Sequence, residues 1–466
     1  MNSLYKFSKY IFILIAVAGL QSCVATKDYQ RPEQPNGFLT ESFADSLPKQ
    51  QVAWQEFLTD NYLQQHIQTA LQNNNDIRIA LQNIEQSKAY LLQGKAAYWP
   101  SLNVGANYSH SVNSTNTMMG GLIGERRHID QYDLTATAGW EPDIWGKITS
   151  QKNRAEASFL QTLAAHQAVK TELIAMVAST YFELLALDEQ KKIAEKTIIN
   201  RLQSVETNQA LKTSGRVTEV AVKQAEAQWL SAQSLLLDID NNIKIKENTF
   251  NILLGQLPTD VPRTASFVDE IPTDLIYKVP AEYILNRPDV TAAEMAFRGA
   301  FEQVNIARTG FFPTLSITAT GGFQSVDMSK VFDVGSLFGN VLGGLTQPIF
   351  NKRQIRTQYE VSLSEQEKAL YNYQQTLLLA SKEVSDAMDT YQSNDKKLGL
   401  KKEEFQAYTD AVEYSEELLN NGLASYIEVL TAKESELAAE LSVVNTQLAK
   451  QLALIKLYKS LGGGVN

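Results

Sequence analysis

The chain has 466 residues, enough for a large core and for two to four domains. It carries 42 Lys and Arg residues against 52 Asp and Glu residues, a formal charge of −10, and it has no basic cluster. This acidic balance argues against nucleic acid as a partner. Hydrophobic residues make up 44% of the chain, which argues against extensive disorder.

The N-terminus has the features of a secretory signal peptide. Lys6 and Lys9 precede an apolar run, Ile11 to Leu20, that is too short to span a bilayer comfortably. The run ends in LQSC, which contains the only cysteine, Cys23. A lone cysteine at this place resembles the lipobox of bacterial lipoproteins; the alternative is an incidental thiol. The resemblance implies a signal peptide at 1–22 and a lipid anchor on Cys23, and a single cysteine leaves no disulfide.

Landmarks in the two halves of the chain indicate an internal duplication. Four pairs are 213 positions apart and later pairs are 207 apart. In chain order the pairs are Asn73 with Asn286, Asp76 with Asp289, Pro100 with Pro313, Leu102 with Leu315, Gly215 with Gly422, and Leu254-Gly255 with Leu461-Gly462. We therefore expect repeat 1 at 23–255, a linker at 256–278 and repeat 2 at 279–466.

Each repeat is predicted to contain a helix, a β-hairpin and two long helices. For repeat 1 we expect a helix from near Trp54 to about Ala97, a hairpin at about 101–140 with strands at 101–112 and 130–140, and helices at about 146–212 and 216–254. For repeat 2 we expect a helix at about 280–310, a hairpin at about 314–347 with strands at 314–326 and 337–347, and helices at about 352–420 and 425–461. Roughly 65 helical residues would extend about 100 Å, a length that suits a spacer across a compartment.

The predicted strands have one apolar and one hydrophilic face. In the first strand Leu102, Val104, Ala106 and Tyr108 alternate with polar or small residues over about ten positions, the length and period of a transmembrane β-strand. The alternative is a half-buried sheet in a soluble protein, but a lone hairpin is marginal in water. No stretch after the signal has 18 consecutive apolar residues, so strands must make any membrane crossing. Because four strands cannot close a barrel in lipid, three chains would be needed to give twelve.

The chain resembles the TolC-like outer-membrane efflux factors, in the lipoprotein branch that serves resistance–nodulation–division (RND) pumps. The segments that carry the resemblance are NRPDVTAAE with GFFPTLSI, WEPDIWGK and QPIF, in an arrangement that covers nearly all of the mature chain. The sequence NKRQ after QPIF departs from the glycines of many members. The resemblance implies a mixed α/β membrane protein: a homotrimer with a twelve-stranded outer-membrane β-barrel, four strands per chain, that continues into a periplasmic α-helical coiled-coil barrel.

The resemblance also implies the partners and the sites. A periplasmic adaptor would dock at the helix turns, at Gly215, Thr218, Gly422 and Ser425, and would connect the channel to an inner-membrane RND pump. In SYIEVL, Glu428 stands at the family's acidic gate position and Tyr426 at an aromatic one. The alternatives are a solvated helix-surface glutamate and a tyrosine that packs against a neighbouring helix.

The function that follows is passive conduction of small molecules, such as drugs, toxic compounds or metal ions, through the outer membrane. Two alternatives are a duct for type I protein secretion and a lipid-anchored coiled-coil scaffold without a pore. No pattern typical of an enzyme, cofactor site or metal site is found, and the four histidines have no ligand-like spacing in the sequence.

Overall fold

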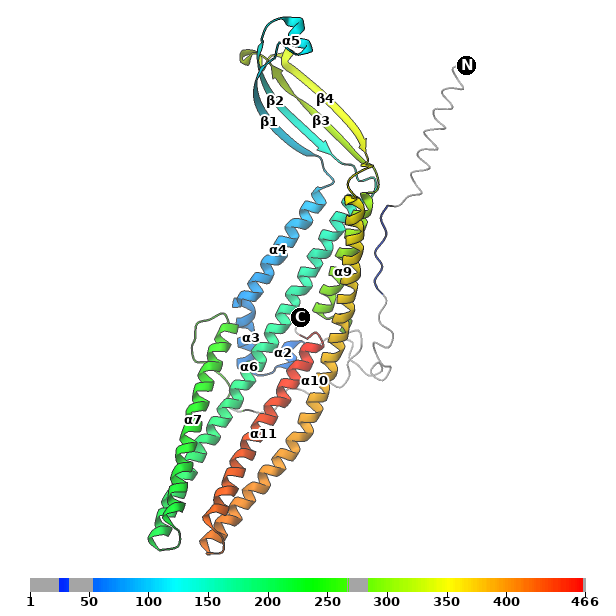
Figure 1. Cartoon of the computed structure of the whole chain (residues 1–466). Coiled ribbons are helices and arrows are strands. Elements are labelled where there is room, and N and C mark those ends of the chain that lie inside the picture. The colour runs from blue at the N-terminus through cyan, green and yellow to red at the C-terminus, as the bar shows by residue number, and fades with distance from the viewer. Residues whose placement is uncertain (1–24, 33–52, 266, 268–283, 464–466) are drawn as a thin grey trace. The chain divides into compact units, whose positions relative to one another are not determined.

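The structure is a computed structural model that describes residues 25–32, 53–265, 267 and 284–463. The predicted signal peptide and Cys23 lie outside these residues, as do most of the linker expected at 256–278 and the start of repeat 2. The described part contains long helices and one four-stranded sheet (Figure 1). None of the described helices is both long and apolar enough to cross a membrane.

The main elements occur twice in the same order, which confirms the internal duplication. The first series is α4 (Asn75–Ala96), β1 (Ser101–Val112), β2 (His128–Trp140), α6 (Lys147–Thr213) and α7 (Glu219–Leu253). The second series is α9 (Pro288–Thr309), β3 (Thr314–Ser325), β4 (Leu337–Thr346), α10 (Gln354–Asn420) and α11 (Tyr426–Ser460). Equivalent helices have equal lengths: 22 residues for α4 and α9, 67 for α6 and α10, and 35 for α7 and α11.

Short elements complete the described chain: α2 (Trp54–Phe57), α3 (Asn61–Asn73), α5 (Met118–Ile123) and the 3₁₀ turns η3 (Met328–Lys330) and η4 (Val334–Ser336). Helix α5 lies in the loop between the first two strands, where no helix was expected. Strand β2 begins at His128, two residues before its predicted start. The other boundaries of strands and long helices agree with the prediction within about three residues.

The single helix expected from Trp54 to about Ala97 is wrong, because the segment forms α2, α3 and α4. Residues 58–60 between α2 and α3 are not helical. Asp60 is the N-cap of α3, since its Oδ1 accepts the Leu63 amide hydrogen at 2.8 Å. Asn74 then adopts an extended conformation, with φ −60° and ψ 132°, and its Oδ1 accepts the Asp76 amide hydrogen at 2.8 Å. The chain therefore restarts its helix at Asn75, because the Asn74 side chain replaces backbone hydrogen bonds.

The helix expected from about 280 to 310 is interrupted: residues 280–283 lie outside the described part, Ile284 and Leu285 are helical, and α9 begins at Pro288. Arg287 is not helical, as expected for a residue before proline. Arg287 and Asn74 are equivalent positions, 213 apart, and both side chains hold the end of a long helix. Asn74 Nδ2 donates to the Leu253 carbonyl at 3.0 Å, and Arg287 Nη1 donates to the Ser460 carbonyl at 2.9 Å. The side chain at the break in each repeat thus donates a hydrogen bond to the carbonyl of the last residue of α7 or α11.

The four strands form one antiparallel sheet in the order β1-β2-β3-β4 (Figure 1). The register aligns the apolar faces of all four strands; one transverse row is Leu102, Ala138, Ala319 and Val341. Leu102 is 70% exposed and Val341 is 75% exposed, so this apolar face is uncovered in the single chain. In β4, Phe338 and Leu342 interrupt the hydrophilic face, yet the strand pairs along its length with β3.

The described chain divides into two compact units that do not coincide with the repeats. Unit 1 holds the sheet with residues 85–160, 294–371 and the described N-terminal segment 25–32, and unit 2 holds the remainder. Each unit therefore takes segments from both repeats. The limits of the two repeats as domains stay a prediction.

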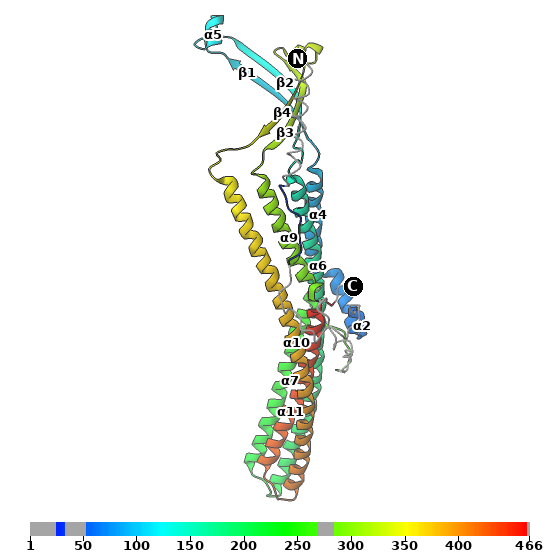
Figure 2. The ribbon, with the colours of Figure 1, turned by 90° about the vertical axis from the view of Figure 1, so that its right-hand side faces the viewer.

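The largest hydrophobic core lies in unit 2. Helices α2, α3, α6, α7, α10 and α11 all contribute to it, and Tyr181, Ile67 and Leu457 at its centre are inaccessible to solvent. Phe57 stacks on Tyr458 with ring centroids 4.4 Å apart. The two helix pairs α6–α7 and α10–α11 run side by side in unit 2, as Figure 2 also shows. A separate small cluster packs beside the turns that end both pairs, and its members are Ala221, Ala225, Tyr426 and Leu430.

Candidate functional site

The two turns predicted as docking sites share one geometry. Gly215 and Gly422 both have φ +73°, a conformation that favours glycine. The amide of Gly215 donates to Lys212 and that of Arg216 to Leu211, both at 2.9 Å, which is a Schellman motif. Gly422 and the residue after it repeat the pattern at 3.0 and 2.8 Å. The sequence pattern therefore located both turns and their glycines.

The fold brings these two turns next to each other within unit 2. Arg216 Nη2 donates to the Asn420 carbonyl at 3.2 Å, although the two residues are 204 positions apart. The residues Thr218 and Ser425 are the N-caps of α7 and α11, with nearly equal backbone angles. All four predicted docking residues thus lie at one end of the helix pairs.

Tyr426 is buried in the single chain. It is 8% exposed and packs with Ala221, Ala225 and Leu430. Burial raises the pKa of its hydroxyl above the usual value. Its ring therefore joins the first turn of α11 to the first turn of α7 and fixes the position of the residues beside it.

Glu428 is exposed and turns back toward the helix start. Its Oε1 accepts from the Ser425 hydroxyl at 3.1 Å and from the Ser425 amide at 3.5 Å. This is the glutamate half of a capping box, which the spacing S-x-x-E could have predicted. The carboxylate thus combines a structural contact with a charge at the surface of the turn.

A polar groove of about 500 Å³ lies beside the turns, between α6, α10 and α11. Lys196, Glu436 and Glu440 are among its lining residues. Arg201 is 4% exposed and lines the groove, and within the described part of the chain its Nη1 has no hydrogen-bond partner. Burial lowers the pKa of its guanidinium. Arg201 could not be found from the sequence, because a single arginine in a 67-residue helix has no local signal of burial.

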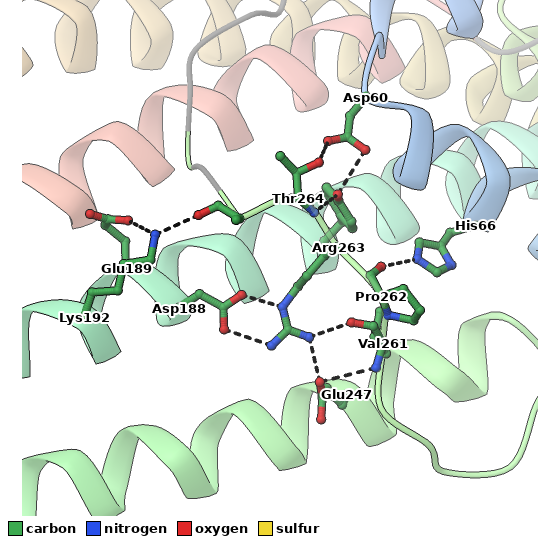
Figure 3. A network of polar contacts seen from close by, with 12 residues as sticks. Asp60, His66, Asp188, Glu189, Lys192, Glu247, Val261, Pro262, Arg263 and Thr264 are labelled. Carbon is green, nitrogen blue, oxygen red and sulfur yellow. Dashed lines mark hydrogen bonds and ion pairs between the residues drawn. The ribbon is translucent and has the colours of Figure 1, made fainter. Parts of the chain in front are cut away.

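The described start of the linker is tied to the helices by a polar network (Figure 3). Arg263 donates to both Asp188 oxygens, at 2.5 and 2.9 Å, and to Glu247 Oε1 at 2.6 Å. The next residue, Thr264, donates its hydroxyl hydrogen to Asp60 Oδ2 at 2.6 Å. The hydroxyl of Tyr181 connects Thr264 with Asp60, since it accepts the Thr264 amide hydrogen and donates to Asp60. The described start of the segment expected as a linker is therefore anchored at α3, α6 and α7.

Three of the four histidines make defined polar contacts. His66 Nε2 lies 2.7 Å from the Pro262 carbonyl, and His110 lies between Asp130 and His128. Burial and the Lys170 charge lower the pKa of His166. Within the part of the chain that the structure describes, no group of three or more His, Cys, Asp or Glu side chains is arranged to hold a metal ion.

Comparison with known proteins defines the class. The profile of the outer membrane efflux protein family matches residues 66–256 and 279–463. The chain is 28% identical to the solvent efflux pump outer membrane protein SrpC of Pseudomonas putida, over 97% of both chains. It is 28% identical to the cation efflux system protein CusC of Escherichia coli O6:H1, over 98% of both chains. It is 27% identical to the probable outer membrane lipoprotein SilC of Salmonella typhimurium, over 96% of both.

A crystal structure of CusC superimposes on 95% of this chain and on all of its own, with a TM-score of 0.85. The fold is thus that of the trimeric outer-membrane channels, in which each chain adds four strands to a barrel and long helices to a tunnel. The chain belongs to the outer membrane efflux protein family. It is an outer-membrane efflux channel, and its family and relatives are transport proteins rather than enzymes.

Proposed function

We propose that this channel is the outer component of a tripartite pump and that its paired turns dock a periplasmic adaptor. Three copies would close a twelve-stranded barrel through the free edges of β1 and β4. The adaptor would connect the channel to an RND pump in the inner membrane. The observation that carries the proposal is the shared Schellman geometry of the two turns, which gives a trimer six nearly equivalent docking positions.

The grooves beside the turns suit such a partner. Thr218 and Ser425 begin helices whose first turns are joined by Tyr426. The adjacent groove is lined by Arg201, whose buried Nη1 has no acceptor among the described residues, and by Lys196, whose side chain is 66% exposed. A carboxylate of the adaptor would reach Lys196, whereas the buried donor of Arg201 is closed to a docking partner. The Glu428 side chains of three copies would form the acidic ring of the gate, and the buried Tyr426 would position them.

Cysteine crosslinking tests the docking. Thr218→Cys and Ser425→Cys should each crosslink, in intact cells, to cysteines at the tip of the periplasmic adaptor of the same pump. Ser114→Cys, in the loop between β1 and β2 and outside the helix turns, is the matched control. Crosslinks from the control alone would reverse the proposed orientation and overturn the assignment.

We further propose that Cys23 carries the lipid anchor, on the basis of LQSC at the end of the signal segment. Several acyl chains at about 0.8 kcal/mol per buried CH₂ would hold the N-terminus lastingly in the membrane. Labelled palmitate should enter the wild-type chain and not Cys23→Ser. Equal labelling of the two proteins would sink this part of the proposal.

The cargo is proposed to be small molecules or ions. Two relatives are named for solvents and for cations, and both match this chain over nearly its full length. Selection among cargoes would lie with the pump, because the duct performs no chemistry.

A further inference from the structure

Two histidines that are 18 residues apart in the sequence meet at the loop end of the β1–β2 hairpin. The register pairs His110 with Asp130 and Val112 with His128, so both histidines are on the same face of the two strands. His128 Nδ1 lies 3.4 Å from His110 Nε2, and the ring centroids are 5.5 Å apart. The strand pairing, not the local sequence, creates this contact.

The other nitrogen of His110 faces a carboxylate. His110 Nδ1 lies 2.7 Å from Asp130 Oδ1, which also accepts a hydrogen bond from the Tyr108 hydroxyl at 2.9 Å. Because a carboxylate can only accept, Nδ1 of His110 carries the proton. In this tautomer Nε2 has the lone pair, and it is directed toward His128.

This arrangement matches that of a histidine prepared to bind a metal ion. Metal-ligating histidines usually donate their second N–H to a carboxylate, which fixes the tautomer and increases the basicity of the ligating nitrogen. Two nitrogens bound to one tetrahedral ion at about 2.0–2.1 Å are about 3.3 Å apart. The observed 3.4 Å fits that separation, whereas it is long for a hydrogen bond between the rings.

We propose that His110 and His128 form a two-histidine site for a borderline transition-metal ion of tetrahedral geometry, Zn²⁺, with Asp130 as the positioning residue and Cu²⁺ as the spectroscopic probe of the two nitrogen ligands. The remaining coordination positions would be filled by water, since His110 and Asp130 are each 44% exposed. A bound ion would join the ends of β1 and β2, on either side of the loop 113–127. The proposal does not depend on the adaptor, the gate or the identity of the cargo.

The direct test is metal titration of the full-length protein, purified with an affinity tag that lacks histidine. Calorimetry and electron paramagnetic resonance with Cu²⁺ alone should show one ion per chain with two nitrogen ligands. Zn²⁺ should bind more weakly, following the usual order of affinities. Asp130→Asn should weaken Cu²⁺ binding about 10–100-fold, and His110→Gln or His128→Gln should remove the two-nitrogen signal.

His166→Gln, in unit 2, is the matched control and should leave the titration unchanged. A second measurement needs no variant: bound Zn²⁺ should protect His110 and His128 together from modification by diethyl pyrocarbonate, as read by peptide mass spectrometry. His66 and His166 should react at the same rate with and without the ion. Equal modification of His110 in both conditions, or a Cu²⁺ signal unchanged in His110→Gln, would overturn the proposal.

Discussion

At the scale of single residues, Glu428 illustrates how one side chain combines a local and a proposed collective role. It caps the start of α11 through Ser425 in each chain. In a trimer its carboxylate would also lie near the Glu428 carboxylates of the other two chains. Glutamine preserves a capping box, whereas alanine removes it, so the two roles can be separated.

We expect Glu428→Gln to weaken the cation preference of the channel and its block by Mg²⁺, with assembly intact. At ~6 Å and an effective dielectric constant of ~20, each pair of carboxylates would repel by about 3 kcal/mol, and such a ring favours bound cations. Single-channel conductance in planar bilayers, with Mg²⁺ on the side of the helix turns, measures both effects. Glu428→Ala should show the same loss and additionally lower thermal stability. If conduction and block do not change in Glu428→Gln, Glu428 is a solvated surface residue.

Two glycines with the same backbone conformation are expected to differ in their tolerance of alanine. Gly215 has φ +73° and open space around an added Cβ. Gly255 has φ +68°, and an added Cβ would lie 2.6 Å from the Asn73 carbonyl oxygen. Gly215→Ala should therefore cost about 1–2 kcal/mol of backbone strain, and Gly255→Ala about 3 kcal/mol or more. Thermal unfolding followed by circular dichroism compares them, and equal losses would contradict the close contact between Gly255 and Asn73.

At the scale of elements, the Arg263 network holds the described linker segment against two long helices. The side chains of Arg263 and Glu247 are 13% and 12% exposed, so their charges are largely removed from water. Arg263→Met should cost about 3–5 kcal/mol, because Asp188 and Glu247 lose their shared cation. Lys88→Met removes an ion pair whose lysine is 54% exposed and which does not touch the linker, and it should cost about 0–1 kcal/mol. Calorimetric unfolding should rank the two variants in this order, and a reversed order would refute the anchoring role.

The same network predicts a loss of stability in alkali. Burial is the main reason that the pKa of Tyr181 is raised to about 12 from the ordinary 10.0. Because the folded-state pKa is the higher one, the stabilisation is complete below pH 10 and is lost as the pH rises toward 12. The loss should amount to about 1–3 kcal/mol. Tyr181→Phe should flatten this part of the pH–stability curve; an unchanged slope above pH 10 would show that another group is responsible.

At the scale of the whole molecule, β1 and β4 leave two unpaired strand edges in each chain. Edges within lipid must be paired, and the apolar face gives Val104 and Val341 the same orientation. Val104→Cys combined with a cysteine at 339, 341 or 343 should produce a covalently linked trimer on a denaturing gel. Val104→Cys with Ala319→Cys is the control, because β3 is an interior strand. Trimers from the control, or none from all three test pairs, would exclude closure through these edges.

The sequence alone determined the order of the long helices, the four strands and the two turns. The alternation of apolar and polar residues along a strand and the glycine at a helix end are local signals, and each signal occurs in both repeats. The break at Arg287 has a local signal in the following Pro288, which the single predicted helix overlooked, and Asn74 caps the restarted helix locally. The carbonyls that the two side chains satisfy could not be predicted, because they lie 179 and 173 residues further along, at Leu253 and Ser460.

Only the tertiary structure decided which polar side chains meet. Strand register placed His128 against His110, and helix packing buried Arg201 beside Tyr426. Arg263 binds Asp188 on α6 and Glu247 on α7, and no local sequence pattern connects it to either residue. The physical reason is that periodicity specifies which face of an element is apolar, whereas the partner of a polar group depends on how separate elements pack.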